Sequence, residues 1–301
     1  MAREIGDVTT HPADNDTPLI VVHGNCQAES VRRVIDGPDV TTVRIPPAHE
    51  LAADDIPSLT RLLARADALV SQPVRDNYRG LAIGTRQLAA LMPASATTVL
   101  IPVIRFSGLY PFHLIVRPPS DLSATPPLVA YHDARLLRTA YDRRSDPTAK
   151  VHRVTLSPHQ VLEIGRRSLA ELTQREHRHA TVVASDIFDT VSFAQMRTIN
   201  HPGNAVWAIV GARVRRALGL TRAPTELHRP LLNSVHAPRL SVVAEAYGLS
   251  DAPSGHWLVD GRSVTTEEVE DAHLGWYETH PDAVDAGLTR HAETLAELGL
   301  R

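Results

Sequence analysis

The segment 19–35 constrains the fold of this chain more than any other feature, because a strand-length apolar run meets a helix-spaced pattern across one tight turn. Residues 19–22 are all aliphatic, and the run stops at Gly24. Apolar residues then recur at helical spacing, at Ala28, Val31, Val34 and Ile35. We therefore predict a strand, a tight turn and a helix. Cys26, the only cysteine of the chain, falls at or beside the first helical turn.

The same alternation continues to residue 104. Aliphatic and β-branched runs at 40–45, 68–71 and 97–104 predict three further strands, and amphipathic patterns at 58–66 and 85–92 predict helices between them. Strands that alternate with helices form right-handed βαβ units and hence a parallel sheet. We expect an α/β fold: an N-terminal parallel sheet of about four strands with helices on both faces, in Rossmann- or SGNH-like layering, followed by a largely helical C-terminal half.

The C-terminal half shows mainly helical periodicity. Helices are predicted over residues 159–177, 187–198, 203–218, 238–247 and 283–298. Asp260-Gly261 between two apolar pairs predicts a small hairpin over residues 257–264, and Thr265 with Glu268 forms a capping box for the helix that follows. We expect a loose tail over residues 1–17 and one α/β domain with a helical extension over residues 18–301, with a subdivision near residue 115 as the alternative.

Composition argues against several classes of protein. A formal charge of −3 gives no support for nucleic-acid binding, which needs a concentrated basic face. One cysteine cannot form an internal disulfide, and no apolar run approaches the roughly 20 residues that cross a bilayer. The first 18 residues lack the apolar segment of a signal peptide. We expect a cytoplasmic protein without a membrane span, and the oligomeric state stays open.

The carboxyl ends of the predicted strands bring the polar residues of interest together, because ligands bind at that edge of an open α/β sheet. Gly24-Asn25-Cys26 follows the first strand and Gln72 follows the third, so Cys26 and Gln72 should lie close together. A helix N-terminus stabilises a thiolate, which suits Cys26 to nucleophilic chemistry. The alternative is that Cys26 is a small, inert, apolar filler of the turn.

Three blocks of sequence resemble one known family. They are Gly24-Asn25-Cys26-Gln27 after the first strand, Ser71-Gln72-Pro73-Val74-Arg75-Asp76-Asn77-Tyr78-Arg79 after the third, and Asn200-His201-Pro202 before a later helix. In this order, and with the proline-bearing stretch 101–111, they look like the WcbI family of polysaccharide-biosynthesis proteins, which are regarded as coenzyme A-dependent O-acetyltransferases. The resemblance implies acyl transfer from coenzyme A, as a co-substrate, to a saccharide or other small-molecule acceptor that it does not identify.

Arginine residues suit the phosphates of such a donor, because the guanidinium group donates paired hydrogen bonds. Arg75 and Arg79 are the candidates, with Tyr78 packing on another part of the ligand. The alternative is an exposed loop that bonds to its own helix. We also expect Gly24, Gln27 and Asn200, which belong to the matched blocks, to bind the donor. Asn204, at the start of the helix beside the third block, is a further candidate.

The thiol requires a base, and histidine titrates near working pH. The candidates are His23, which strand alternation should turn away from Cys26, His113, which lies in the loop after the fourth strand, and His201. Pro202 is a good first helical residue, so His201 should sit at a helix N-terminus whose dipole keeps the imidazole neutral. Its match to the family block makes His201 our choice; the alternative is that it only caps its own helix.

These residues suggest a mechanism. Cys26 either carries the acyl group or forms a polar wall beside direct transfer, and His201 deprotonates the thiol or the acceptor hydroxyl. Backbone N–H groups of Cys26 and Gln27, with the side chains of Asn25 and Gln72, would stabilise the oxyanion.

Other readings stay open. They are a Cys-dependent esterase or thioesterase, a transferase that takes its acyl group from a carrier protein, and a non-catalytic binding protein. No metal is expected, because His177 and His179 are too close in sequence for helical i, i+4 pairing and no cysteine pair exists.

Overall fold

The computed structural model describes residues 17–301, so the predicted loose tail lies outside the described residues except for Thr17. The described chain forms two compact units. Unit 1 comprises the residues up to Ile104 together with Leu169–Thr190 and Pro202–Leu232. Unit 2 comprises Arg105–Ser168, Val191–His201 and Asn233–Arg301. Each unit has its own sheet and its own packed helices.

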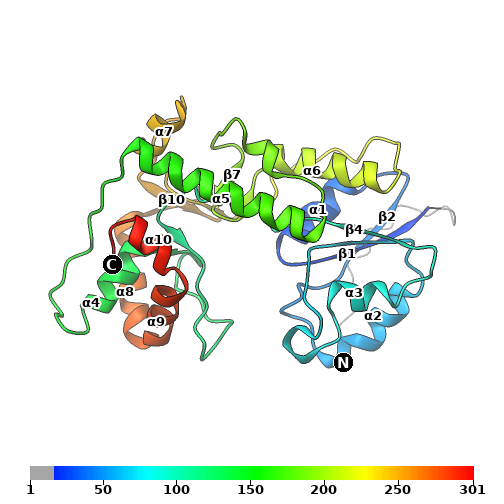
Figure 1. Ribbon diagram of the computed structural model, residues 1–301, viewed down its shortest axis with the longest axis horizontal. Helices are drawn as coiled ribbons and strands as arrows, with labels where there is room; N and C mark the ends of the chain where they lie inside the picture. Colours follow the sequence, from blue (N-terminus) through cyan, green and yellow to red (C-terminus); the bar gives the residue numbers. More distant parts are fainter. Residues whose placement is uncertain (1–16) are drawn as a thin grey trace. The chain divides into compact units, whose positions relative to one another are not determined.

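Within the described residues of unit 1, four parallel strands form one sheet in the order β2-β1-β3-β4 (Figure 1). Their bounds are β1 Leu19–His23, β2 Thr41–Arg44, β3 Ala68–Ser71 and β4 Thr97–Leu100. The register places Val22 opposite Arg44 on one side and Val70 on the other. This is the predicted N-terminal parallel sheet. Strand β4 ends earlier than predicted, since Pro102 has no N–H for a ladder.

Helices cover both faces of this sheet, as its continuous apolar strands require. One face carries α1 Gln27–Ile35 and α6 Asn204–Ala217, and the other carries α2 Ile56–Leu63 and α3 Thr85–Ala89 (Figure 1). Helices α1 and α6 pack so closely that a Cβ at Gly211 would lie 2.7 Å from Val34. On the opposite face, Val21 and Leu69 pack with Leu59 of α2 and Leu88 of α3.

A buried arginine joins α6 to the end of α1. Arg215 donates to the backbone O of Ile35 at 2.5 Å and to the carboxylate of Asp39 at 2.8 and 2.9 Å. It also donates to the carbonyl O of Arg222. Because these bonds satisfy the guanidinium, its burial is compensated, and α6 is held against the sheet at the end opposite to Cys26.

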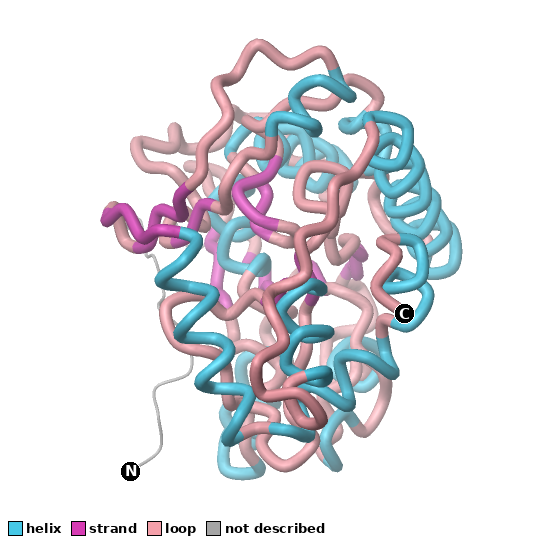
Figure 2. The backbone as a smooth tube through the Cα atoms, turned by 90° about the vertical axis from the view of Figure 1, so that its left-hand side faces the viewer, coloured by secondary structure: helices cyan, strands magenta, loops and turns pink. Residues whose placement is uncertain are grey.

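Unit 2, all of whose residues are described, contains short strands, packed helices and long loops (Figure 2). Strands β9 Val235–His236, β10 His256–Val259 and β11 Arg262–Thr265 form an antiparallel sheet, and β5 His113–Leu114 pairs with β6 His132–Asp133. Helices α4 Ala134–Asp142, α8 Thr266–Thr279 and α9 Pro281–Arg290 pack on one another, with α7 Ser241–Tyr247 and α10 Ala292–Glu297 nearby in sequence. The predicted hairpin and the Thr265–Glu268 capping box are confirmed.

The remaining helices, turns and strands lie between the elements named above along the chain. They are the 3₁₀ turns η1 Ala53–Asp55, η2 Tyr78–Gly80 and η3 Ser185–Phe188, the helix α5 Pro158–His179, and the strands β7 Met196–Thr198 and β8 His201–Pro202. No helix within residues 17–301 has the length and apolar character needed to cross a membrane.

The predicted helix over residues 187–198 is wrong. The chain there forms the short turn η3 and then the strand β7. The carboxylate of Glu176 accepts the backbone N–H groups of Ala184 and Ser185, and Ser192 N–H bonds to the side chain of Gln195. The bonds to Glu176 fix the chain just before the predicted helix, and the side chain of Gln195 satisfies a backbone N–H, that of Ser192, which a helix would otherwise pair. A local pattern of apolar spacing therefore does not decide the structure here.

Candidate functional site

Cys26 lies on the turn between β1 and α1. It is the N-cap residue of α1 and is exposed to solvent, so the structure does not make it a buried filler. The first backbone N–H groups of a helix have no intrahelical partner and carry partial positive charge. The strand–turn–helix predicted from the sequence is therefore present, with the sulfur at the positive end of a nine-residue helix.

Gln72 braces this turn from the end of β3. Its side-chain Oε1 accepts the backbone N–H of Asn25 at 2.8 Å, and its Nε2 donates to Gln27 Oε1 at 3.2 Å. A Cβ at Gly24 would come within 2.5 Å of Gln72 Oε1. The predicted closeness of Gln72 to the Cys26 turn is confirmed, and glycine is required at position 24 because the amide of Gln72 occupies that space.

The side chain of Gln27 is used by the fold. It is fully buried, donates from Nε2 to the carbonyl O of Ile104 at 2.7 Å, and accepts the N–H of Ile104 at 3.0 Å. We expected Gln27 among the residues that bind the donor. Because both ends of its amide already bond to protein groups, Gln27 holds the chain after β4 against the Cys26 turn.

The predicted set of oxyanion donors needs a correction. The backbone N–H of Gln27 donates to Asn25 Oδ1 at 2.8 Å, so this donor is engaged within the turn. The side-chain N–H of Gln72 is likewise directed to Gln27. For Asn25 Nδ2, in contrast, no group within residues 17–301 acts as an acceptor. The Asn25 amide is thus the side-chain donor that the turn offers.

The acidic residue in the first turn of α1 is paired with two arginines of the same helix. This residue, Glu29, pairs with Arg32 at 2.7 Å and with Arg33 at 2.8 Å. Burial opposes ionisation of Glu29, but the hydrogen bonds and charges of Arg32 and Arg33 prevail and lower its pKa. The negative charge of Glu29 is therefore compensated, and it does not cancel the positive end of the helix beside Cys26.

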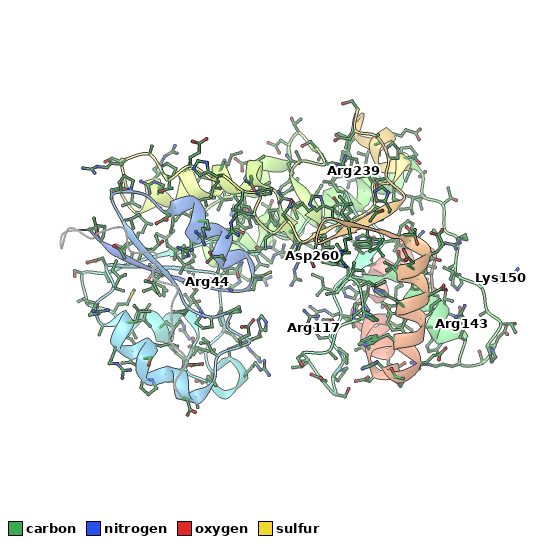
Figure 3. All side chains as sticks on the ribbon, turned by 180° about the vertical axis from the view of Figure 1, so that it is seen from behind. Arg44, Arg117, Arg143, Lys150, Arg239 and Asp260 are labelled. Carbon is green, nitrogen blue, oxygen red and sulfur yellow. The ribbon has the colours of Figure 1, made fainter. Side chains whose placement is uncertain are left out.

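Arg44 is a polar residue of this edge that our sequence analysis did not select (Figure 3). It is the last residue of β2, and Thr42, two residues before it, bonds to Arg32 of α1 at 3.4 Å. Side chains two apart share a face of a strand, so Arg44 lies on the α1 face at the carboxyl edge. Its Nε is shielded from solvent, and no acceptor for it exists in the described chain. A polar residue closing a strand at the ligand-binding edge was the available signal.

The three residues of the segment after β3 that we predicted to bind the donor differ in exposure and contacts. Arg75 is exposed, whereas Tyr78 packs against the apolar cluster between the sheet and α2 and α3. Arg79 donates to the backbone O of His49 at 2.6 Å. The side chain of Arg75 is therefore open to solvent. Tyr78 and Arg79 instead make the contacts of a loop bonded to its own surroundings.

His23 and His201 each have a pKa below that of an exposed imidazole. Burial lowers the pKa of His23 to about 4, with a backbone group of Ile83 acting in the opposite direction. His23 shares the strand face of Val21, opposite to α1, as predicted. Burial also lowers the pKa of His201 to about 4, helped by the charges of Arg197 and His236. His201 is thus neutral at neutral pH.

The cause of this neutrality is not the predicted helix dipole. Helix α6 begins at Asn204 with Gly203 as its N-cap, and His201 lies earlier, in β8. Its ring meets Tyr131 edge-on, with centroids 5.7 Å apart, inside unit 2. Cys26 belongs to unit 1, so the structure describes the sulfur and this imidazole in separate units.

The two asparagines of the predicted donor site bond to protein groups. Asn200 Oδ1 accepts from Tyr131 Oη at 2.8 Å. Asn204 donates from Nδ2 to the carbonyl O of Arg229 at 3.2 Å and accepts the N–H of Leu231 at 2.8 Å. Both atoms of the Asn204 amide therefore fix the segment that follows α6, which leaves them unsuited to a phosphate.

Comparison with known proteins decides the family. A family model described as polysaccharide biosynthesis enzyme WcbI matches residues 19–223, which include the Cys26 turn, the segment after β3 and His201. This chain belongs to the WcbI family. No curated protein matches it.

A solved structure of a WcbI protein shares the fold. It is 19% identical in sequence, with a TM-score of 0.74, and the match covers 94% of this chain and 99% of that one. It is described as native WcbI, a novel polysaccharide biosynthesis enzyme, without a disulfide bond between coenzyme A and one of its cysteines. At this level of identity, the likeness shows that the two proteins share their fold.

Proposed function

We propose that this WcbI-family protein is an acyltransferase that moves an acetyl or related group from a coenzyme A thioester to a hydroxyl of a sugar or another small-molecule acceptor. The observation that carries the proposal is the position of Cys26: exposed, at the N-cap of α1, and directly after a buried parallel strand. A nucleophile at a strand-to-helix turn, with helix N–H groups beside it, has the geometry of acyl-transfer sites.

Coenzyme A as the donor fits the chemistry of this edge. Arg44, whose Nε lacks an acceptor in the described chain, and the exposed Arg75 are cations suited to the phosphates of the donor. The description of the solved WcbI structure, which refers to a disulfide between coenzyme A and a cysteine of that protein, is consistent with a thiol placed near the donor.

In the reaction, Cys26 thiolate attacks the thioester carbonyl. The carbon–sulfur bond to coenzyme A breaks, an acyl–Cys26 bond forms, and the coenzyme A thiolate leaves and takes a proton. The acceptor hydroxyl then attacks acyl–Cys26, giving its proton to a base, and the thiolate of Cys26 is regenerated. The side-chain amide of Asn25 is the proposed donor to the oxyanion of both steps.

His201 is the base that we propose. With a pKa of about 4 it is unprotonated throughout the neutral range and able to accept a proton. His201→Gln is expected to lower turnover about a hundredfold or more. For the wild-type enzyme, kcat/KM should lose activity on the acidic side near pH 4 rather than near pH 6.5. Full activity of His201→Gln would remove His201 from the mechanism.

A trapping experiment tests the covalent step. Protein mixed with acetyl-CoA and no acceptor, quenched in acid, should gain the mass of one acetyl group, which peptide mapping places on Cys26. Cys26→Ala should fold, bind coenzyme A and gain nothing. If Cys26→Ala retained full turnover, Cys26 would not be the nucleophile. Acetyl release to water at the same rate with and without a sugar acceptor would indicate a hydrolase.

Ligand-induced stabilisation tests the donor. A ligand that binds only the native protein adds about 2.7 kcal/mol to its stability at a hundredfold excess over Kd. We expect coenzyme A and acetyl-CoA to raise Tm, and Arg44→Gln to reduce that rise. No rise with either compound would contradict coenzyme A as the donor and would favour a carrier protein.

A further inference from the structure

A small cavity in unit 2 combines flat aromatic rings with paired charges. It encloses about 130 Å³, and its walls include Tyr110, His113, Asp133, Arg135, Trp257 and Glu270. All of these residues belong to unit 2, away in sequence from the turn that carries Cys26. The mechanism proposed above uses none of them, so the arrangement needs a separate explanation.

One wall of the cavity is a stack of three rings. The imidazole of His113 stacks with Tyr110, at a centroid distance of 5.6 Å and an angle of 1°, and with Trp257, at 4.9 Å and 19°. Stacking holds the rings rigidly, and the apolar parts of the rings that line the cavity can pack against the C–H groups of a ligand. A pyranose ring presents such C–H groups on one side and hydroxyls around its edge.

The cavity also carries two ion pairs of balanced sign. Arg135 pairs with Asp133 at 2.7 Å and lies 4.2 Å above the ring of Phe112. Arg153 donates two hydrogen bonds to Glu270, at 2.8 and 3.1 Å. Paired carboxylates and guanidiniums offer fixed acceptors and donors without a net field. This suits the hydroxyls of a neutral ligand better than an anion, which an unpaired arginine would favour.

His113 has a polar atom that the fold leaves unused. Its Nδ1 is shielded from solvent, and no residue of the described chain forms a hydrogen bond with it. Burial lowers the pKa of His113 to about 4, with Asp133 opposing and Arg135 and His273 assisting, so the ring is neutral at neutral pH. A shielded, unpaired polar atom destabilises a fold and so calls for an explanation. A ligand hydroxyl that bonds to it supplies one.

We propose that this cavity binds one neutral sugar ring, with its C–H groups against the parts of Tyr110 and Trp257 that line the cavity and its hydroxyls on Asp133, Glu270 and His113. That this sugar is part of the acyl acceptor rests on the proposed function. That the cavity binds a sugar does not depend on it. A volume of about 130 Å³ leaves no room for a second ring, so only one residue of a longer saccharide would enter the cavity.

Calorimetric titration with D-glucose, D-galactose and D-mannose tests the proposal, with D-glucuronate and inorganic phosphate as anionic probes. His113→Phe keeps a flat ring in the stack and removes the unpaired nitrogen. Glu270→Gln keeps the size of the side chain and removes one charged acceptor. Trp276→Phe is the matched control, because Trp276 stacks on His280 in α8 and does not line the cavity.

We expect saturable binding of at least one neutral hexose, weakened about tenfold or more in His113→Phe and Glu270→Gln and unchanged in Trp276→Phe. His113→Phe should also have an equal or higher Tm than wild type without sugar, which shows that it folds. Cys26→Ala should bind the sugar normally, so a failure of the acyltransfer proposal leaves this result intact. No binding of any neutral hexose, equal binding by all variants, or binding of the anionic probes alone would overturn the assignment.

Discussion

The side-chain Oε1 of Gln72 accepts the backbone N–H of Asn25 at 2.8 Å, and this bond ties the end of β3 to the turn that presents Cys26. The same amide donates to Gln27, whose own side chain bonds to Ile104 beyond β4. The chain segments that follow three neighbouring strands are thus linked by side-chain amides. The position of the exposed sulfur depends on this linkage, because its bonds hold the residues on both sides of Cys26, Asn25 and Gln27.

Replacing Gln72 by Ala should destabilise the protein and slow the reaction of Cys26. The change leaves the partly buried N–H of Asn25 without its acceptor, at a cost of about 1–3 kcal/mol. Urea unfolding measures the first effect, and the rate of alkylation of the single thiol by iodoacetamide measures the second. Gln174→Ala, on the exposed side of α5, is the control and should change neither quantity. Wild-type alkylation kinetics in Gln72→Ala would show that the linkage does not position Cys26.

Gly24→Ala should be destabilising, because the new Cβ meets Gln72 Oε1 at 2.5 Å. Accommodating the methyl group requires movement of the Gln72 amide and loss of its bonds, for a cost of about 1–3 kcal/mol. Gly275→Ala in α8 has open space around its Cβ and should be stabilising by about 1 kcal/mol through helix propensity. Thermal melts of the two variants should therefore shift in opposite directions. A neutral Gly24→Ala would contradict the close approach.

Arg44→Gln should reduce both the reactivity of Cys26 and the affinity for coenzyme A. Loss of a positive charge at the carboxyl edge raises the pKa of a nearby thiol and removes a phosphate ligand. The pH dependence of alkylation should move to higher pH, and the Kd for coenzyme A should rise about tenfold. Arg61→Gln, on the exposed surface of α2, removes one positive charge just as Arg44→Gln does, and this control should behave as wild type. Equal effects of both substitutions would indicate long-range electrostatics only.

Stability should fall on acidification because of buried histidines such as His23. Its folded pKa of about 4 lies below the ordinary 6.5, so between these values the unfolded chain binds more protons than the folded one. The stabilising contribution is therefore complete above pH 6.5 and is lost as the pH falls towards 4. It is on the order of 2–3 kcal/mol. His23→Leu should flatten this part of the stability profile, measured by urea unfolding from pH 4 to 7. An unchanged slope would refute a neutral buried His23.

Local sequence patterns predicted the elements whose formation depends on near neighbours. The turn at Gly24 and the hairpin at Asp260-Gly261 are both punctuated by residues that favour turns. The capping box of Thr265 and Glu268 likewise involves groups three residues apart. In contrast, the predicted helix over residues 187–198 is wrong, because the side chain of Gln195 bonds to the backbone N–H of Ser192 and the chain then forms the strand β7. No apolar periodicity reports such side-chain competition.

The sequence by itself determined the parallel sheet, the strand–turn–helix that carries Cys26, and the gathering of polar residues at the carboxyl edge, since strand and helix periods are local properties. Only the tertiary structure decided which of those polar groups remain available. Gln27 bonds to Ile104, 77 positions away, and Gln72 bonds to the turn 47 positions before it, whereas Arg44 Nε has no acceptor in the described chain. The physical reason is that a buried polar atom takes whichever partner the packed chain brings to it, and that partner is set by distant contacts rather than by neighbouring residues.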